Sequence, residues 1–194
     1  MIAIEEQGEL IEALRKGSET AFKAVIQQHQ RQVYNVCLSF LGNQEDAEDL
    51  AQEVFLTLFE KIEGFRSDAT LSTWLYRVAV NKSLEHIRKM KSLKRWGGVK
   101  AFLTGEQTSH HPVNFDHPGI VLENKEQAQI LMQNVAQLAE NQRIAFTLHK
   151  MEGLSYAEIA DVMKVSLSAV ESLIFRANQG LRKSLKDYYQ SNYK

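Results

Sequence analysis

The 194-residue sequence predicts an all-α protein made of two small helical domains joined by a flexible linker. Three observations support this fold class. Apolar residues recur at helical spacing along most of the chain, no segment shows the sustained alternation expected of strands, and both prolines fall in one window near the middle. The predicted division is a first domain at residues 1–95, a linker at 96–122 and a second domain at 123–194.

Three amphipathic helices are predicted in the first domain. Two of them have apolar stripes at residues 22–40 and 47–62, where the apolar positions are three and four residues apart. Asn43 is the predicted N-cap of the second helix, and the acidic residues after it favour the positive end of the helix dipole. A third helix is predicted at residues 71–91. Helical structure is therefore expected over most of this domain.

The window at residues 97–119 has no helical stripe and predicts a linker. It contains Pro112 and Pro118, four of the ten glycines and three of the six histidines. A proline interrupts a helix because it lacks the backbone N–H and its ring clashes with the preceding turn. Helical spacing resumes near Leu122 and continues through Leu148.

Four potential metal ligands lie in this window, and they raise the alternative of a metal site or an enzyme. They have no helical or Cys/His framework with ordered ligand spacing, so we expect no metal, no other cofactor and no catalytic residue. The four residues are His110, His111, Asp116 and His117.

The end of the second domain predicts a helix-turn-helix. Ser155 is the expected N-cap of a short helix, and Glu158 completes a capping box. A three-residue connection leads to a longer helix at residues 167–185, whose amino-terminal part would enter a DNA major groove. A plain helical hairpin is the alternative. The exposed face of the second helix is expected to carry Ser168, Glu171, Ser172, Phe175 and Arg176.

The net charge of −1, from 23 basic and 24 acidic side chains, conceals a strong segregation. Residues 1–63 carry a net charge of −7 and residues 64–100 a net charge of +7. Local fields, rather than the total, determine which surface meets which partner. The balanced total therefore does not exclude a nucleic acid.

The exposed face of the helix at residues 47–62 is almost wholly acidic. A solvated surface explains such a face, and a contact with a basic protein partner is the sharper alternative. The residues on this face are Asp46, Asp49, Gln52, Glu53 and Glu60.

The next helix is basic, and the loop before it is flanked by aromatic residues. Basic side chains beside aromatic rings suit a single nucleic-acid strand, because cations contact phosphates while rings and pockets receive unstacked nucleobases. At least one of Trp74 and Tyr76 is expected to pack in the core instead. The candidate residues are Phe65, Arg66, Trp74, Tyr76, Arg77, Asn81, Lys82 and Arg88.

Cysteine content and hydropathy indicate a cytoplasmic location. The single cysteine, Cys37, permits no internal disulfide and lies on an apolar stripe, as expected of a packed side chain. The longest largely apolar run, at residues 33–41, is too short to cross a bilayer, and the amino terminus does not resemble a signal peptide. We therefore expect no membrane insertion.

Several segments, taken in order, resemble the extracytoplasmic-function group of the sigma-70 family of bacterial RNA polymerase sigma factors. Their order and their spread over residues 20–91 and 125–185 make the resemblance specific. The segments are DAEDLAQEVF at 46–55, FRSDATLSTWLYRVAVN at 65–81, LAENQR at 138–143, EGLSYAEIA at 152–160 and FRA at 175–177.

The resemblance implies a sigma-two domain and a sigma-four domain in a transcription initiation factor that is not an enzyme. Asp46, Asp49, Gln52 and Glu53 match the helix by which the family binds core RNA polymerase. The segment from Phe65 to Arg88 matches the part that opens and reads the minus-ten promoter element, with Asn81 near a flipped base. The helix-turn-helix matches the part that reads the minus-thirty-five element. The residues implied there are Tyr156, Ser168, Glu171, Ser172, Phe175 and Arg176. The family is often held inactive by an anti-sigma factor, which is the further partner implied.

Two departures from the family pattern affect the helix-turn-helix. Lys164 occupies a turn position that is commonly glycine, so a non-glycine residue is expected to adopt a positive φ or to alter the turn. Glu171 stands where a basic residue is frequent, and its carboxylate would repel phosphate but accept a hydrogen bond from cytosine N4. The alternative function is an autonomous helix-turn-helix repressor or activator, which would bind duplex DNA without polymerase.

Overall fold

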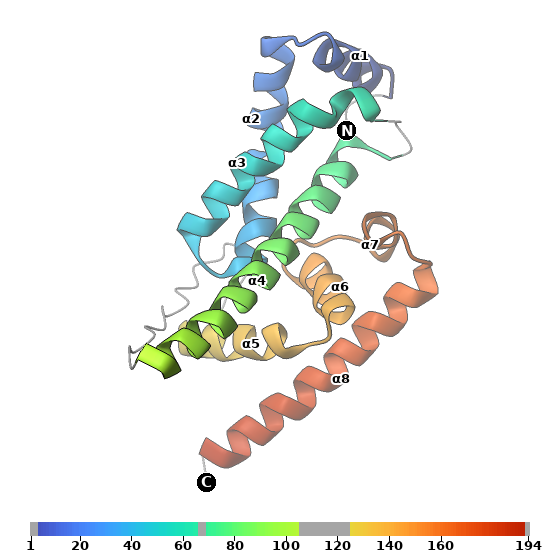
Figure 1. Cartoon of the computed structure of the whole chain (residues 1–194). Coiled ribbons are helices and arrows are strands. Elements are labelled where there is room, and N and C mark those ends of the chain that lie inside the picture. Colours follow the sequence, from blue (N-terminus) through green and yellow to red (C-terminus); the bar gives the residue numbers. More distant parts are fainter. Residues whose placement is uncertain (1–3, 66–68, 105–124, 193–194) are drawn as a thin grey trace.

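The computed structural model describes residues 4–65, 69–104 and 125–192, and within these ranges every regular element is helical. The all-α prediction is confirmed (Figure 1). The elements, in chain order, are α1 (Ile4–Arg15), α2 (Glu19–Leu41), α3 (Gln44–Lys61), the short 3-10 helix η1 (Ile62–Gly64), α4 (Leu71–Thr104), α5 (Lys125–Gln137), α6 (Glu140–Lys150), α7 (Tyr156–Met163) and α8 (Leu167–Asn192). None of the described helices is both long enough and apolar enough to cross a membrane.

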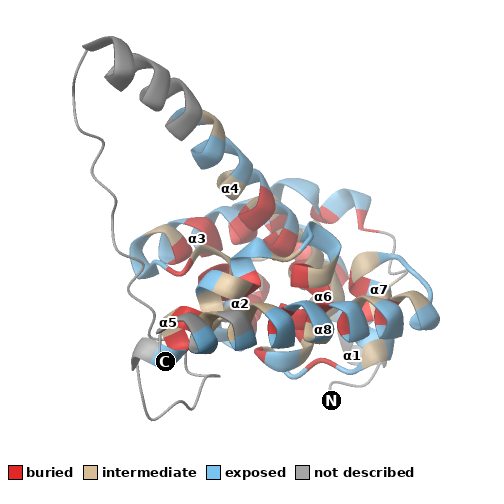
Figure 2. Ribbon diagram, turned by 90° about the horizontal axis from the view of Figure 1, so that it is seen from below, coloured by how far each residue is buried: buried red, intermediate tan, exposed pale blue. Residues whose placement is uncertain are grey.

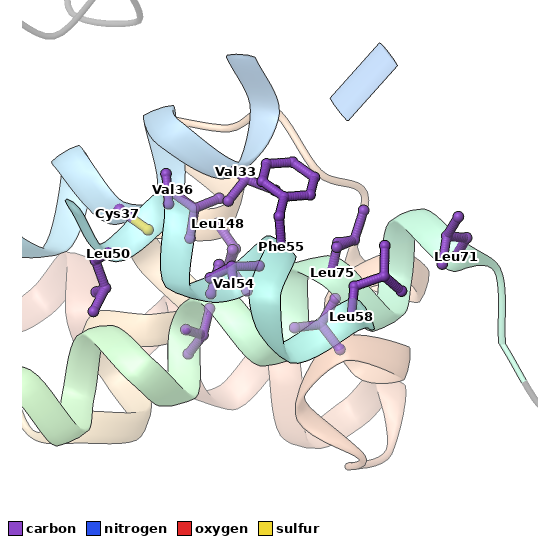
Figure 3. Packing of buried hydrophobic residues seen from close by; sticks show 14 of the residues in the cluster. Val33, Val36, Cys37, Leu50, Val54, Phe55, Leu58, Leu71, Leu75 and Leu148 are labelled. Atoms are coloured by element: carbon purple, nitrogen blue, oxygen red, sulfur yellow. The ribbon is translucent and has the colours of Figure 1, made fainter. Parts of the chain in front are cut away.

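Helices α2, α3 and α4 pack along one another and form the first half of the molecule (Figure 1). Gly42 ends α2 with φ 67°, and the side chain of Asn43 accepts a hydrogen bond from the backbone N–H of Glu45 at 3.0 Å. This places the α2–α3 break where the sequence predicts it. Apolar stripes of all three helices then face inward, with Val54, Leu58 and Leu75 fully buried (Figure 3).

Two features of the first half differ from the sequence-based expectation. Helix α1 had no predicted counterpart, and it buries Ile11 and Leu14 at the end of the bundle. Helix α4 runs on to Thr104, past residue 95 where we expected the linker to begin. Glycines lower helix propensity without preventing helix formation, so Gly97 and Gly98 did not mark its end. Residues 105–124 lie outside the described ranges.

The second half, α5 to α8, packs against the first half through a continuous apolar core. Ile144 and Leu148 of α6, together with Ile159 of α7, belong to the same buried cluster as the core of α2, α3 and α4. Leu148 lies among the residues of that cluster in Figure 3. Figure 2 shows buried residues in helices of both halves, among them α3 and α6. The division into domains at 1–95 and 123–194 stays a prediction, because the two halves share this core.

The helix-turn-helix has the local structure that its sequence predicts. Ser155 and Glu158 form both hydrogen bonds of the capping box, and the Ser166 side chain accepts from the N–H of Ala169 at 3.2 Å at the start of α8. Lys164 has φ 55° and ψ 48°, so the turn keeps a left-handed residue without glycine. Val165, in the connection that follows, is 38% exposed.

We predict that Lys164→Gly stabilises the protein by about 0.5–1 kcal/mol. The left-handed conformation crowds a Cβ atom but not glycine, and part of this gain is offset by the greater freedom of glycine in the unfolded chain. Urea unfolding followed by circular dichroism measures the change. Lys164→Ala is the control, since it removes the long side chain and keeps the crowded Cβ; an equal gain there would contradict the explanation.

Candidate nucleic-acid and protein-binding surfaces

The acidic face of α3 is exposed at its centre and paired with α4 along one edge. Asp49, Gln52 and Glu53 are exposed, as the sequence predicts, whereas Asp46 is half-buried. Lys82 of α4 forms an ion pair with Glu53 at 3.1 Å. Asp46 lies 3.9 Å from the ring of His86 and accepts a hydrogen bond from Asn43 at 3.0 Å. Two of the four predicted carboxylate or amide residues therefore also bind neighbouring side chains of this protein.

Two large apolar side chains extend this face toward the carboxyl end of α3. Leu56 is 62% exposed and Phe59 is 60% exposed. The sequence pattern placed Phe59 in the buried stripe, so its exposure corrects that interpretation. The Phe59 ring makes an edge-to-face contact with Phe22 of α2 at 5.2 Å, beside a surface cavity of about 330 Å³. In the sequence, Leu56 is an apolar residue outside the buried stripe, and this position alone could have indicated an apolar contact surface here.

Phe65 does not present its ring to solvent, in contrast to the expected contact with DNA. It is 5% exposed and makes an edge-to-face contact with Trp74 at 6.3 Å. The guanidinium of Arg15 donates to the Phe65 carbonyl oxygen at 2.5 Å and forms an ion pair with Glu12 at 2.6 Å. Packing against Trp74 and the hydrogen bond from Arg15 of α1 thus give Phe65 a structural role. Arg66, the next predicted residue, lies outside the described ranges.

The aromatic side chains at the start of α4 are mainly packing residues. Trp74 and Tyr76 are half-buried and both contact the apolar core, which confirms the expectation that at least one of them packs there. Burial raises the pKa of the Tyr76 hydroxyl above its ordinary value, and the nearby charges of Glu152 and Glu158 act in the same direction. The phenol therefore remains protonated over the physiological pH range.

Three of the predicted basic and amide residues of α4 line a cleft between α4 and the second half. Arg77, Asn81 and Arg88 contribute to one wall of this cavity, whose volume is about 560 Å³. Glu140 and Lys164 lie on the opposite wall. Lys82 is not among the lining residues, because it turns toward Glu53 on α3. With Trp74, which also lines the cleft, the structure gathers four members of the predicted set there and places Lys82 outside it.

Polar contacts across the cleft hold its two walls together. The guanidinium of Arg77 donates two hydrogen bonds to the carbonyl oxygen of Asp161, and its Nε lies 2.9 Å from that oxygen. Arg88 forms an ion pair with Glu140 at 2.5 Å. Both arginines are therefore engaged by the second half in this arrangement. Asn81 is exposed within the cleft.

The start of α8 presents the surface that the helix-turn-helix pattern predicts. Phe175 is 62% exposed, and the Nε of Arg176 donates to the carbonyl oxygen of Ser172 at 3.1 Å. Tyr156 is half-buried, with its ring against His149 at 4.9 Å. A face rich in hydroxyl and guanidinium groups can donate to phosphates and to base edges. The exposed residues are Ser168, Glu171, Ser172, Phe175 and Arg176.

The described residues do not point to a metal or thiol site. Cys37 is completely buried, and this burial raises the pKa of its thiol to about 12. The described ranges contain no cluster of three potential metal ligands. The alternative ligands His110, His111, Asp116 and His117 fall outside those ranges.

Comparison with known proteins gives two family matches in chain order. Residues 25–92 match the family model described as sigma-70 region 2, and residues 128–179 match the one described as sigma-70, region 4. The RNA polymerase sigma-H factor of Pseudomonas aeruginosa is 30% identical over 96% of this chain and 97% of its own length. The ECF RNA polymerase sigma factor SigW of Bacillus subtilis is 30% identical over 91% of this chain and 95% of its own.

Solved structures share the fold. One is CnrH in complex with the cytosolic domain of CnrY, with a TM-score of 0.64 and 20% identity over 93% of this chain and 97% of that one. Another is the sigma factor RpoE in complex with the anti-sigma factor NepR from Bartonella quintana, with a TM-score of 0.60 and 23% identity over 85% of this chain and 96% of that one.

The capping box of α7 predicts a pH-dependent stability. Hydrogen bonds from the side chain and backbone N–H of Ser155 hold the pKa of Glu158 below its ordinary value of 4.5. A depressed pKa in the folded state means that the stabilisation is present above the unfolded-state pKa and is lost as the pH falls through the folded-state value. Glu158→Gln should therefore destabilise the protein at pH 7 by about 0.3–1 kcal/mol, the range for an exposed carboxylate at a helix amino terminus.

Urea unfolding at a series of pH values measures this difference. The gap between the two proteins should narrow as the pH falls below 4.5 and should also shrink in a Ser155→Ala background. A gap that stays constant from pH 7 to pH 3 would refute the assignment of the charge effect to Glu158.

Proposed function

The chain belongs to the extracytoplasmic-function sigma factors of bacterial RNA polymerase, and from this premise we propose which of its surfaces binds polymerase and which binds each promoter element. As a sigma factor it is a transcription initiation factor that binds core polymerase and directs it to specific promoters. The observation that carries the detailed proposal is the separation of three surfaces: the acidic α3 face, the cleft-lining side of α4 and the exposed start of α8. We expect it to act in the cytoplasm, together with polymerase.

The proposed polymerase contact is the α3 face, with its acidic centre and its apolar end. Asp49, Gln52 and Glu53 supply charge and hydrogen-bond acceptors for a basic partner surface, while Leu56 and Phe59 supply apolar area. An interface of this kind gains most of its affinity from buried large side chains and its orientation from the polar groups around them. Leu56 and Phe59 thus add an apolar anchor to the set predicted from the sequence.

The proposed contact with the opened minus-ten element is the α4 side of the cleft. Asn81 can read a nucleobase edge, and Arg77 and Arg88 can contact phosphates on either side of it. In the described arrangement both arginines bind the second half of the chain instead. Binding a promoter strand therefore requires α6 and α7 to move away from α4, which exchanges these internal contacts for phosphate contacts.

The proposed contact with the minus-thirty-five element is the start of α8, which would lie in the major groove. Arg176 suits guanine or phosphate, and Glu171 suits the amino group of cytosine. Ser168, Ser172 and Phe175 complete the surface, and Tyr156 of α7 is included in the proposed contact because the family resemblance implies it. Because Glu171 repels phosphate, it favours those sequences in which it can accept a hydrogen bond.

We further propose that an anti-sigma factor controls this protein. Two solved structures of similar fold were determined as complexes with such regulators or with the cytosolic domain of a partner. An inhibitor that covers the α3 face or holds the two halves together would block the contacts described above.

A reconstituted transcription assay tests the function as a whole. The protein with core polymerase should initiate at defined start sites, and core alone should not. An autonomous helix-turn-helix repressor or activator would instead bind duplex DNA tightly without polymerase. Tight specific duplex binding together with no affinity for core would reject the proposed division of surfaces.

Asp49→Arg and Phe59→Asp should each weaken binding to core polymerase by roughly tenfold or more. The first places a cation against a basic partner surface, and the second removes a large apolar contact. Fluorescence anisotropy of labelled protein titrated with core measures the affinity. Glu9→Arg is the matched control, since Glu9 is an exposed acid on a different helix, α1. Unchanged affinity of both variants, or an equal loss in the control, would reject the assigned face.

Asn81→Ala should slow promoter opening by roughly tenfold while leaving closed-complex formation nearly unchanged, since a specific base contact contributes on this scale. Permanganate footprinting reports opened DNA, and a filter-binding assay on duplex promoter reports the closed complex. Asn141→Ala, on the opposite wall of the same cleft, is the control and should leave opening intact. Equal effects of Asn81→Ala in both assays would remove its role in strand recognition.

A further inference from the structure

Arg143 of α6 is a buried cation without an acidic partner. Its residue is 9% exposed, and its Nε atom is enclosed with no hydrogen-bond partner. Among the described residues no carboxylate forms an ion pair with it, because Glu140 binds Arg88. The guanidinium lies over the ring of Phe40, 5.8 Å from its centroid. Burial lowers the pKa of Arg143, a tendency that nearby Glu140 opposes and Arg88 reinforces.

Arg143 lines a small cavity where the end of α2 meets α5 and α6. The cavity has a volume of about 140 Å³, and most of its wall is apolar, with Phe40 and Leu41 from α2 and Met132 and Val135 from α5. Exposed Gln133 and Ala136 on α5 lie at its rim, so the cavity opens to solvent on that side. A buried charge thus lines a cavity that has access from outside.

Physical chemistry defines the ligand that fits this cavity. An enclosed Nε–H without an acceptor is destabilising, and a carboxylate that pairs with the guanidinium in bidentate geometry can supply the missing acceptor. The apolar wall favours a ligand with an apolar tail. A volume of about 140 Å³ is below the range of roughly 300–1,000 Å³ typical of pockets for drug-sized ligands, which excludes a nucleotide.

We propose that this cavity binds a small monocarboxylate with a short apolar chain. The carboxylate pairs with the guanidinium of Arg143, and the chain lies against Phe40 and the α5 wall. The tail must be short, because the volume of the cavity is only about 140 Å³.

The position of the cavity links ligand binding to the arrangement of the two halves. Phe40 belongs to the first half and Arg143 to the second, so a bound ligand contacts both. We call the structure in which the two halves are packed together the closed arrangement. A ligand that binds only this arrangement shifts the equilibrium between packed and separated halves toward it. On the proposed function, in which α6 and α7 must leave α4, such a carboxylate acts as an inhibitor of promoter opening.

Titration of the full-length protein with hexanoate tests the binding site. Chemical-shift changes at α2, α5 and α6 should saturate, and two probes of matched chemistry should bind at least roughly tenfold more weakly: acetate, which lacks the tail, and hexanamide, which lacks the charge. Equal binding of acetate and hexanoate indicates a non-specific anion effect and overturns the proposal, as does the absence of saturation.

Two kinds of variant separate loss of the site from loss of folding. Arg143→Gln should weaken hexanoate binding by roughly tenfold or more. Ala136→Trp fills the rim from an exposed position and keeps Arg143, so it should abolish binding in a folded protein, whereas Gln137→Trp, at the next exposed position outside the cavity, should not. Unchanged binding by Ala136→Trp, in a protein whose circular dichroism is that of the wild type, would place hexanoate elsewhere and overturn the proposal.

The rate of promoter opening tests whether hexanoate holds the two halves together. Hexanoate should slow promoter opening by wild-type holoenzyme assembled in its presence, and it should have no effect with Ala136→Trp. Hexanoate that binds without slowing opening rejects the link to the closed arrangement. Failure of hexanoate to bind a protein that still initiates transcription rejects the cavity and leaves the proposed function intact.

Discussion

Burial of apolar side chains from both halves of the chain in one core is the interaction on which the remaining structure depends. Leu148 of α6 and Ile159 of α7 are fully buried in the same cluster as Val54 and Leu75 of the first half. Full burial of one such side chain contributes about 1.5–3 kcal/mol, so a few of them are enough to hold the halves together. The relative positions of the three proposed binding surfaces, including the covered side of α4, follow from this shared core.

Polar groups at the interface between the two halves make the closed arrangement specific and also limit its stability. Arg77 and Arg88 find acceptors on the second half, and the hydroxyl of Ser39 donates to Glu152 at 2.6 Å. Among the described residues Arg143 has no such acceptor, and its burial opposes closure. Apolar contacts hold the two halves together, but the halves can separate when a partner offers better contacts for Arg77 and Arg88.

Several charged side chains of α3 and α4 are paired within the protein, and a binding partner must replace these internal pairs. Helix α3, from the acidic segment at residues 1–63, and helix α4, from the basic segment at 64–100, lie side by side (Figure 1), and Glu53 pairs with Lys82 between them. The charges of the two segments, −7 and +7, cancel, so the small net charge of the chain hides two neighbouring regions of opposite sign. Asp49 remains exposed on the acidic surface, and Arg77 and Arg88 are covered on the basic one. In the closed arrangement the acidic face is thus more accessible than the cleft side of α4.

The sequence by itself determined the all-helical class, the break at Gly42 and the capping box at Ser155 and Glu158, whereas the structure decided between the two alternatives for Lys164 in favour of a left-handed residue. The features that the sequence determined depend on side chains within one turn of each other, so local spacing is sufficient to predict them. Only the tertiary structure decided that Phe65 is buried and Phe59 exposed, because that depends on what α1, α2 and α4 place against each ring. The tertiary structure also decided that Arg77 and Arg88 face the second half and that Arg143 is buried with no ion-pair partner among the described residues. These contacts join helices that are far apart in the sequence, so the spacing of residues along the chain does not predict them.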